Sequence, residues 1–339
     1  MSSPAHAFTL ALAQAATLGE GLQWHAASGR WWWTDIEGAS LHAWTPGDAH
    51  TLTVRLPERV GCFVHARSGR LLLAMAKRLA WLTLPDLRAT GTVPGEPETI
   101  TPLEPQLATR ANDGLCDRSG ALVFCTLHEG DPQRPLGSLY QYSLARGLRR
   151  LPLDGVAIAN SICFSPDGRR LYYADTPTRR ILVCDYDSAS ALVSEPRVFV
   201  EKAAAHGFPD GSTVDAQGHL WNAEWGAGAV ARYTPTGELV GRWTAPVPHT
   251  TCPAFGGAAG DQLLLTTARA GMSSAELMAR PQSGSLFGMP VAPALTWPRR
   301  CSTTPEPALV RPNAATATPA RQPAGPRACP WPRRGGAVG

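Results

Sequence analysis

The 339-residue sequence is poor in charge and lacks the long regular patterns of helical and membrane proteins. Charged residues make up only 17% of the chain. There is no long helical periodicity, no coiled-coil heptad pattern and no apolar run long enough to span a bilayer. With 33 glycines and 31 prolines present as well, the composition argues against a helical bundle and favours many short strands joined by turns.

Several sequence motifs of catalysis and metal binding are also missing. Without a GxSxG elbow or an HExxH segment, a serine hydrolase or a zinc peptidase has no support. The eight cysteines form no CxxC pair, so we expect buried, reduced thiols in a cytoplasmic protein rather than a zinc or redox motif. No basic residue precedes the apolar residues 8–13, which we therefore interpret as a strand and not as a targeting segment.

The positive net charge of +4 comes from the end of the chain. Residues 293–339 hold seven arginines, ten prolines and a single acid, Glu306. The other 292 residues hold 24 basic and 26 acidic side chains, so the body has no basic face that would suggest nucleic-acid binding. We predict a folded domain over 1–292 and a disordered tail over 293–339. The tail is a genuine extension, an out-of-frame stretch or a basic anchor for an acidic partner.

One sequence pattern recurs six times. Each copy is a turn glycine followed by a short apolar strand. The copies are GRWWWTD from Gly29, GRLLLAM from Gly69, GALVFCT from Gly120, GRRLYYAD from Gly168, GHLWNAE from Gly218 and GDQLLLTT from Gly260. Successive anchor glycines are 40, 51, 48, 50 and 42 residues apart, a period that is typical of β-propeller blades.

Six copies predict an all-β fold, a six-bladed β-propeller with four-stranded blades. Residues 8–13 would supply the outer strand of the last blade and close the ring, since an open ring would leave two unpaired sheet edges. A pair of β-sandwiches or a β-helix is the alternative, but six like units at this period favour the propeller.

Polar residues recur at nearly the same offset before the anchor glycines. One lies nine residues before its glycine and three lie eight residues before theirs: Glu20, Asn112, Asn160 and Asp210. A propeller relates equivalent positions by rotation about its axis, so these four side chains should meet at the mouth of the central channel. We expect them in the turn before each innermost strand, with the carboxylate of Asp210 exposed.

Two carboxylates and two carboxamides in one place suggest a metal site. Close carboxylates repel each other and one pKa rises, and a divalent cation removes this conflict. The all-oxygen set favours Ca²⁺, Mg²⁺ or Mn²⁺, whereas Zn²⁺ is possible but prefers other ligands. The alternative is that these residues merely cap turns, because Asn and Asp are common turn residues.

Five segments carry a further likeness. They are LGEG from Leu18, RANDGLCD from Arg110, NSICFS from Asn160, PDG from Pro209 and AFGG from Ala254. Together they resemble the gluconolactonase / senescence-marker-protein (regucalcin-like) family, over about residues 8–289. The resemblance implies a six-bladed propeller and a metal-dependent lactonase acting on sugar-acid lactones.

The resemblance also implies roles for individual residues. It assigns the metal to Glu20, Asn160 and Asp210. Asn-Ser stands at 160–161 where many relatives have Asn-Gly, and this change leaves the ligand intact.

Substrate contacts follow from the same resemblance. It assigns them to Arg110 and Asn112, with an acidic contact at Glu129 or, one residue later, Gly130. For a lactone we expect Asp210 to act as general base. The forked guanidinium of Arg110 would bind ring oxygens or the developing oxyanion, and the carboxamide of Asn112 would bind sugar hydroxyls.

The leading hypothesis is a carboxylic ester hydrolase that opens an aldonolactone to the aldonic acid with one divalent metal ion, Ca, Mg, Mn or Zn. The alternatives are a propeller esterase for other lactones or phosphotriesters, and a non-catalytic propeller that binds calcium or a partner. Arg110 and Asn112 favour an enzyme, because a structural ion needs no such neighbours. We expect a cytoplasmic monomer or weak oligomer that binds a small sugar lactone, without nucleic acid or membrane.

Overall fold

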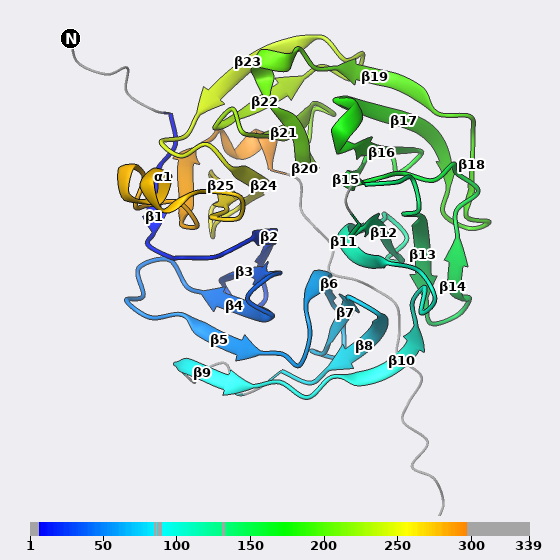
Figure 1. The fold of residues 1–339 in the computed structure, drawn as a ribbon, viewed down its shortest axis with the longest axis horizontal. Helices are drawn as coiled ribbons and strands as arrows, with labels where there is room; N and C mark the ends of the chain where they lie inside the picture. Colours follow the sequence, from blue (N-terminus) through cyan, green and yellow to red (C-terminus); the bar gives the residue numbers. More distant parts are fainter. Residues whose placement is uncertain (1–6, 85, 87–89, 131–132, 297–339) are drawn as a thin grey trace, which may run out of the picture. The chain divides into compact units, whose positions relative to one another are not determined.

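The computed structural model describes residues 7–84, 86, 90–130 and 133–296. These residues form six β-sheets arranged in a ring (Figure 1). Each sheet contains one copy of the sequence repeat, so the predicted six-bladed β-propeller is confirmed. Helix is scarce in the described part, and its elements are α1 (Ser274–Ala279), η1 (Thr176–Thr178), η2 (Ala204–His206) and η3 (Pro293–Leu295).

The strands of a blade follow one another outward from the axis of the ring. The innermost strands are β2 (Gly19–His25), β6 (Val60–His65), β11 (Thr109–Cys116), β15 (Ala159–Phe164), β20 (Phe208–Val214) and β24 (Thr250–Gly256). The second strands follow the anchor glycines and are β3 (Arg30–Asp35), β7 (Leu71–Met75), β12 (Leu122–His128), β16 (Arg170–Asp175), β21 (Leu220–Trp225) and β25 (Gln262–Thr267).

The outer half of each blade is built in the same way. The third strands are β4 (Ser40–Trp44), β8 (Arg78–Leu82), β13 (Leu139–Ser143), β17 (Arg180–Asp187), β22 (Ala229–Tyr233) and β26 (Leu286–Pro290). The outer strands are β5 (Leu52–Arg55), β10 (Glu98–Pro102), β14 (Gly147–Arg150), β18 (Leu192–Val193), β19 (Arg197–Glu201), β23 (Leu239–Thr244) and β1 (Thr9–Leu12).

The ring closes through the first strand of the chain. Strand β1 pairs antiparallel with β26, and Leu10 lies opposite Phe287. The main-chain N–H of Phe8 donates to the carbonyl oxygen of Thr244 in the neighbouring blade at 3.1 Å. Residues 8–13 therefore close the last blade as the sequence predicts, and its sheet edge is paired.

Two sheets depart from the four-stranded pattern. The connection between β8 and β10 contains a fifth strand for the first blade, β9 (Gly91–Pro94), which pairs in parallel with β5. In the fourth blade, β18 and β19 pair with different parts of β17. The first and second blades are thus joined by main-chain hydrogen bonds at their outer edge.

Every innermost strand has an irregularity where it pairs with its second strand. The register shifts within each of the six pairs, after Glu20, Val60, Ala111, Asn160, Pro209 and Thr250. Such bulges bend a strand and redirect side chains. Inside the innermost strands, these bulges hold the four residues of the repeated offset, Glu20, Asn112, Asn160 and Asp210, so their placement in a preceding turn was wrong. The strands that follow the anchor glycines are second in each blade.

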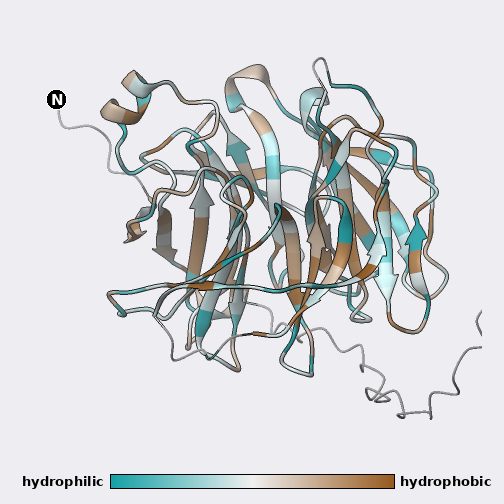
Figure 2. Ribbon diagram, turned by 60° about the horizontal axis from the view of Figure 1, so that its bottom comes forward, coloured by the Kyte–Doolittle hydropathy of each residue, from teal (hydrophilic) through white to brown (hydrophobic). Residues whose placement is uncertain are grey.

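The cores lie between neighbouring blades. In β3, Trp31 and Trp33 pack against the sixth blade, whereas Trp32 packs against the second, because side chains alternate between the two faces of a strand. All three rings are fully buried. In Figure 2, strands of the blades carry long hydrophobic segments, and hydrophilic colour occurs both on strands and in the connecting turns. Cys62, Cys125 and Cys184 are buried as free thiols.

The folded chain continues slightly past the predicted boundary at residue 292. Leu295 in η3 packs against the core between the fifth and sixth blades, and its carbonyl oxygen accepts a hydrogen bond from the N–H of Ala216 at 2.9 Å. The remaining tail, 297–339, lies outside the described residues, so its predicted disorder stays a prediction. In the described part of the chain, no helix is long and apolar enough to cross a membrane.

Candidate active site at the centre of the ring

Two buried carboxylates from different blades meet at the centre of the ring. Glu20 in β2 and Asp210 in β20 are close enough for each carboxylate to affect the pKa of the other, and they are 7% and 5% exposed. Burial raises the pKa of each well above its usual range, and crowding with another carboxylate adds to the shift. The prediction that Asp210 is exposed in a turn was wrong, because the inward bend of β20 buries it.

Two carboxamides extend this group across the next blades. Asn112 Nδ2 donates to Asn160 Oδ1 at 3.1 Å, which joins β11 to β15. Asn160 Nδ2 donates to Thr176 Oγ1 at 3.1 Å, and that hydroxyl donates to the carbonyl oxygen of Pro209 at 2.9 Å. The contacts therefore run from Asn112 through Asn160 to the residue before Asp210.

Arg110 and Glu129 lie beside the carboxamides. The Nη1 atom of Arg110 donates to Asn112 Oδ1 at 2.8 Å, and its Nε atom lies 3.8 Å from Glu129 Oε1. Burial lowers the pKa of Arg110, and the nearby carboxylate of Glu37 opposes this shift. The structure thus places the carboxylate of Glu129 beside the predicted substrate residues, and Gly130, the other sequence candidate, has no side chain to contribute.

The second blade contributes main chain instead of a side chain. Its residue at the equivalent position is Gly61, and a Cβ atom there would lie 2.5 Å from main-chain atoms of Ala111 and Asn112. Real Cβ atoms do not approach main chain so closely, so only glycine lets β6 pack against β11. This packing holds the strand that carries Arg110 and Asn112.

Sequence reasoning missed a third buried carboxylate, that of Asp113. It accepts hydrogen bonds from the N–H groups of Gly114 and Ile162, each at 2.8 Å, and burial raises its pKa to about 6. Its charge also raises the pKa of Glu20 and of Asp210. In the sequence, Asn-Asp-Gly indicates a turn, and only the bulge in β11 brings this side chain inward.

Two charged residues at the edge of the site were missed as well. Arg59 immediately precedes β6, and Glu37 lies between β3 and β4. The Nη1 atom of Arg59 lies 2.7 Å from Glu129 Oε1 and 3.3 Å from Glu37 Oε1. Neither residue falls at the repeated offset, so the repeat gave no signal for them.

Comparison with known proteins shows which family this chain resembles. Residues 18–269 match the family described as SMP-30/Gluconolactonase/LRE-like region. The chain belongs to this family. The chain is 40% identical over 286 residues to an L-arabinolactonase from Azospirillum brasilense, covering 84% of this chain and 92% of that one. It is 34% identical over 253 residues to a pentonolactonase from Haloferax volcanii, covering 74% and 81%.

A solved structure of a similar protein shows the same architecture. It is a calcium-binding protein, regucalcin, from Agrobacterium tumefaciens, with a TM-score of 0.80 and 30% sequence identity. The alignment covers 89% of this chain and 98% of that one. All the site residues described above lie within the part of this chain that matches the family.

The donor set at the centre of this family member fits a hard divalent cation. In the described part of the chain, no group of three or more His, Cys, Asp or Glu side chains forms a metal cluster, so a cation would also need amide oxygens. The carboxamide oxygen of Asn160 is a candidate: Oδ1 accepts a hydrogen bond from Asn112 Nδ2, and Nδ2 donates to Thr176 Oγ1. Two carboxylates and a carbonyl oxygen are ligands that Ca²⁺, Mg²⁺ and Mn²⁺ accept.

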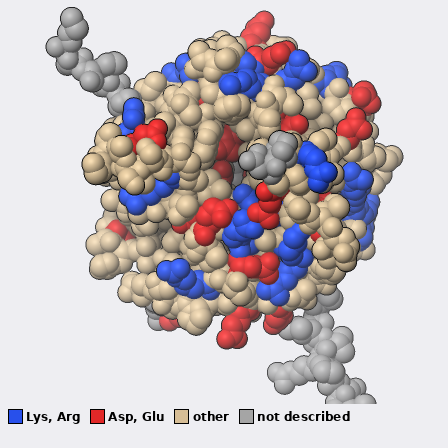
Figure 3. Space-filling model, in the orientation of Figure 1, with Lys and Arg blue, Asp and Glu red and all other residues tan. Residues whose placement is uncertain are grey.

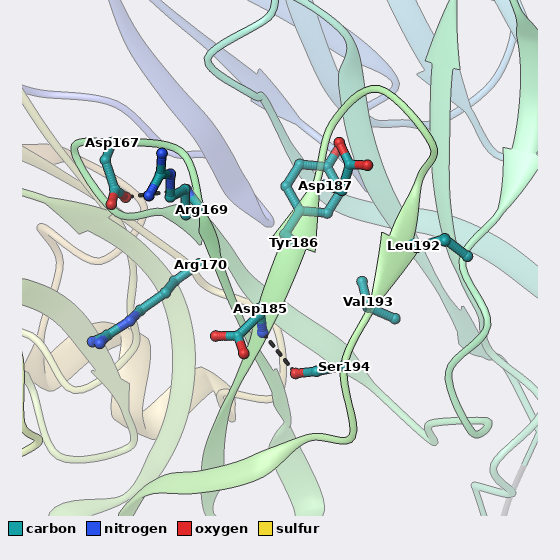
Figure 4. Close-up of a pocket in the computed structure, with 9 residues that line it drawn as sticks. All are labelled: Asp167, Arg169, Arg170, Asp185, Tyr186, Asp187, Leu192, Val193 and Ser194. Carbon is teal, nitrogen blue, oxygen red and sulfur yellow. Dashed lines mark hydrogen bonds between the residues drawn. The ribbon is translucent and has the colours of Figure 1, made fainter.

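A separate surface pocket lies on the fourth blade. Figure 4 shows that it is formed by the turn before β16, the end of β17 and the segment around β18. Its lining includes Asp167, Arg170, Asp185 and Ser194. The turn before β16 follows the end of β15, opposite the end where Asn160 lies, so this pocket is distinct from the central group.

Proposed function

We propose that this chain is a metal-dependent hydrolase that opens a sugar-acid lactone to its aldonic acid. The observation that carries the proposal is the buried pair of Glu20 and Asp210 beside the hydrogen-bonded Asn112 and Asn160. The names of the similar lactonases support the same reaction class. Glu20, Asn160 and Asp210 would hold the cation, and the carboxamide of Asn112 would face the substrate.

The reaction is hydrolysis of a cyclic ester. When bound, the cation supplies a Lewis acid that polarises the lactone carbonyl and makes a water more acidic. Asp210 takes the proton of the attacking water. The water oxygen bonds to the carbonyl carbon, the bond between that carbon and the ring oxygen breaks, and Asp210 gives the proton it took from the water to the ring oxygen, which leaves as a hydroxyl.

Arg110 and Asn112 position the lactone for this attack. Arg110 is only 6% exposed, so its N–H groups act where little water competes, and they stabilise negative charge that develops on the carbonyl oxygen. Asn112 already receives a hydrogen bond from Arg110 at 2.8 Å, which fixes the orientation of its amide. Glu129 accepts hydrogen bonds from substrate hydroxyls at the outer side of Arg110.

The test is acid release from a panel of aldonolactones, with and without a chelator and with Ca²⁺, Mg²⁺, Mn²⁺ or Zn²⁺ restored. We expect turnover to require a cation and to fall by about 100-fold or more in Asp210→Asn, because a general base contributes about that much or more. Arg180→Met is the control, since Arg180 is 48% exposed and pairs with Glu201 on the outer part of a blade. Cation binding without turnover of any lactone would favour a calcium-binding propeller instead.

A further inference from the structure

Four charged side chains of alternating sign surround the outer side of the candidate site. This rim cluster consists of Glu37, Arg59, Arg110 and Glu129. Arg59 contacts both acids, at 3.3 Å and 2.7 Å. Arg110 faces the same two acids, each at 3.8 Å. The cluster contains two positive and two negative groups, so it offers hydrogen-bond donors and acceptors without net charge.

The rim cluster extends from the buried centre of the ring to the surface. The side chain of Arg110 is 7% exposed, whereas those of Arg59, Glu129 and Glu37 are 31%, 32% and 37% exposed. Arg110 lies near the start of β11, and the connections that carry the other three residues lie on the same face, where the innermost strands begin. Figure 3 shows acidic and basic side chains close together around the middle of the ring.

The side-chain contacts form a series that runs outward from the candidate metal ligand Asn160, and a bound molecule would lie along this series. Asn160 contacts Asn112 at 3.1 Å, and Asn112 contacts Arg110 at 2.8 Å. The series continues from Arg110 to Glu129 at 3.8 Å and on to Arg59 at 2.7 Å. Arg59 is therefore the member farthest along this series from the candidate metal ligand.

A lactone bound with its carbonyl at the carboxylate pair directs its remaining atoms toward the rim cluster. Among sugar-acid lactones with the same ring size, one difference is the number of carbon atoms outside the ring, and these carbons carry hydroxyl groups. A hydroxyl both donates and accepts a hydrogen bond, so an Arg–Glu pair satisfies both of its functions. An uncharged polyol also suits a cluster without net charge better than an anion does.

We propose that Arg59 and Glu37 form an outer subsite that binds the hydroxyl groups of the lactone's exocyclic carbons. This inference rests on the proposed function, and it assigns substrate selectivity to two residues outside the predicted site. Both ion-pair contacts of Arg59 use Nη1, and the exposed part of the side chain is turned to the solvent from which substrate enters. A purely structural surface ion pair would contribute little to stability and nothing to selectivity.

The test measures binding separately from turnover. Calorimetry on the full-length protein uses three cyclic ethers that lack the carbonyl and cannot be hydrolysed: anhydroerythritol with no exocyclic carbon, anhydroarabinitol with one, and anhydrogalactitol with two. We expect the wild-type protein to bind the last two about tenfold more tightly than the first, which is the effect of roughly one hydrogen bond to a charged group. In Arg59→Met this preference should disappear, while the affinity for anhydroerythritol stays within about twofold.

Two further variants make the result specific. Glu37→Gln should reduce the same preference, and it replaces Arg59→Met if that variant does not fold. Arg78→Met is the matched control, because Arg78 is 26% exposed and pairs with Glu58 at 2.6 Å beside the cluster; it should bind as the wild type does. Equal wild-type affinity for the three ethers, or an equal loss for all three in Arg59→Met, would overturn the subsite.

Hydrolysis of the corresponding lactones is measured in parallel. If the wild-type protein shows the expected binding preference but hydrolyses none of erythronolactone, arabinonolactone and galactonolactone, the outer subsite stands and the proposed hydrolase function fails. If the lactones are hydrolysed at equal kcat/KM and the ethers bind equally, the function stands and the subsite fails.

Discussion

The hydroxyl of Ser161 donates a hydrogen bond of 2.5 Å to the main-chain carbonyl oxygen of Asp210. Ser161 directly follows Asn160, so one residue ties two strands that carry candidate metal ligands. The same hydroxyl accepts hydrogen bonds from Ser212 Oγ and Asn222 Nδ2, each at 3.1 Å. Ser161 has a φ of 63°, a left-handed conformation that costs energy for any residue with a Cβ atom.

Two substitutions of Ser161 distinguish the contribution of its hydroxyl to stability from the cost of its left-handed backbone conformation. Ser161→Ala keeps the strained Cβ and removes the hydroxyl, so we expect the free energy of unfolding to fall by about 1–3 kcal/mol, because buried polar partners lose a hydrogen bond. Ser161→Gly also loses the bond but relieves the strain, and should be roughly 1 kcal/mol more stable than the alanine variant. Urea unfolding measures both. An alanine variant as stable as wild type would show that the hydroxyl contributes nothing.

Lys202 supports this arrangement from inside the fifth blade. Its Nζ atom donates to Glu224 Oε1 at 2.7 Å, to Asn222 Oδ1 at 3.1 Å and to the hydroxyl oxygen of Tyr233 at 3.0 Å, and its side chain is fully buried. Burial lowers the pKa of Lys202, and Glu224 opposes the shift. Asn222 in turn donates to the carbonyl oxygen of Asp210 at 2.9 Å.

We expect Lys202→Met to reduce the free energy of unfolding by about 3–5 kcal/mol, since removing one partner of a buried ion pair leaves the other without compensation. The decrease should lie near the lower value of this range, because Arg242 still contacts Glu224 at 2.8 Å and compensates part of its charge. Chemical denaturation provides the measurement. Arg180→Met, which breaks an exposed pair, should cost less than about 1 kcal/mol; equal losses in the two variants would contradict the prediction.

A stacked histidine pair should make stability depend on pH. The rings of His25 and His65 are stacked at 4.0 Å between centroids, and Trp32 and Phe63 face His65 edge-on. Burial, and secondly the charge of His25, lower the pKa of His65 to about 3. The pKa in the folded state is thus below the unfolded value, so stabilisation is complete above about pH 6.5 and is lost as the pH falls toward 3.

From pH 7 to pH 5, His65 alone should cost about 2 kcal/mol of unfolding free energy. The measurement is urea unfolding at both pH values in the wild type and in His65→Phe, which keeps an aromatic ring against His25 but does not titrate. The variant should lose about 2 kcal/mol less over this interval. The same pH dependence in both proteins would assign the effect to other groups.

Divalent cations should stabilise the protein through the central carboxylates. A ligand at 100 times its Kd adds about 2.7 kcal/mol to stability, which for a domain of this size is roughly 4–5 °C in Tm. We expect Ca²⁺ or Mn²⁺ to raise Tm by about this amount over chelator-treated protein, and Glu20→Gln to abolish most of the response. Glu238→Gln, at an exposed turn, is the control. An unchanged response in Glu20→Gln would remove Glu20 from the site.

Much of the propeller fold can be predicted from the sequence because most of each blade is formed by one continuous stretch of the chain. Turn glycines and apolar strands recur along the chain, and each copy forms one blade. The repeated offset of Glu20, Asn160 and Asp210 led to their common location because a ring relates equivalent positions by rotation. Their roles as ligands stay predictions, as does the oligomeric state.

The other features of the fold and the site depend on contacts between residues that are not part of the sequence repeat. Arg59 and Glu37 lie in connections whose lengths differ between blades, so only the closed ring shows that they face Glu129. Asp113 is buried because of a bulge in β11, and a change of register leaves no pattern in a single sequence. The parallel pairing of β9 with β5 likewise arises from the long connection between β8 and β10, which the sequence repeat does not predict.

The pairing of β1 with β26 has a consequence for how the protein is made. Thr9 and Gly288, which are joined across this pair, lie 279 residues apart. At a synthesis rate of about 5–20 residues per second, the first strand leaves the ribosome on the order of 15–60 s before its partner. During that interval its main-chain groups are open to other chains, so nascent copies on one messenger RNA are exposed to mispairing until the sixth blade emerges.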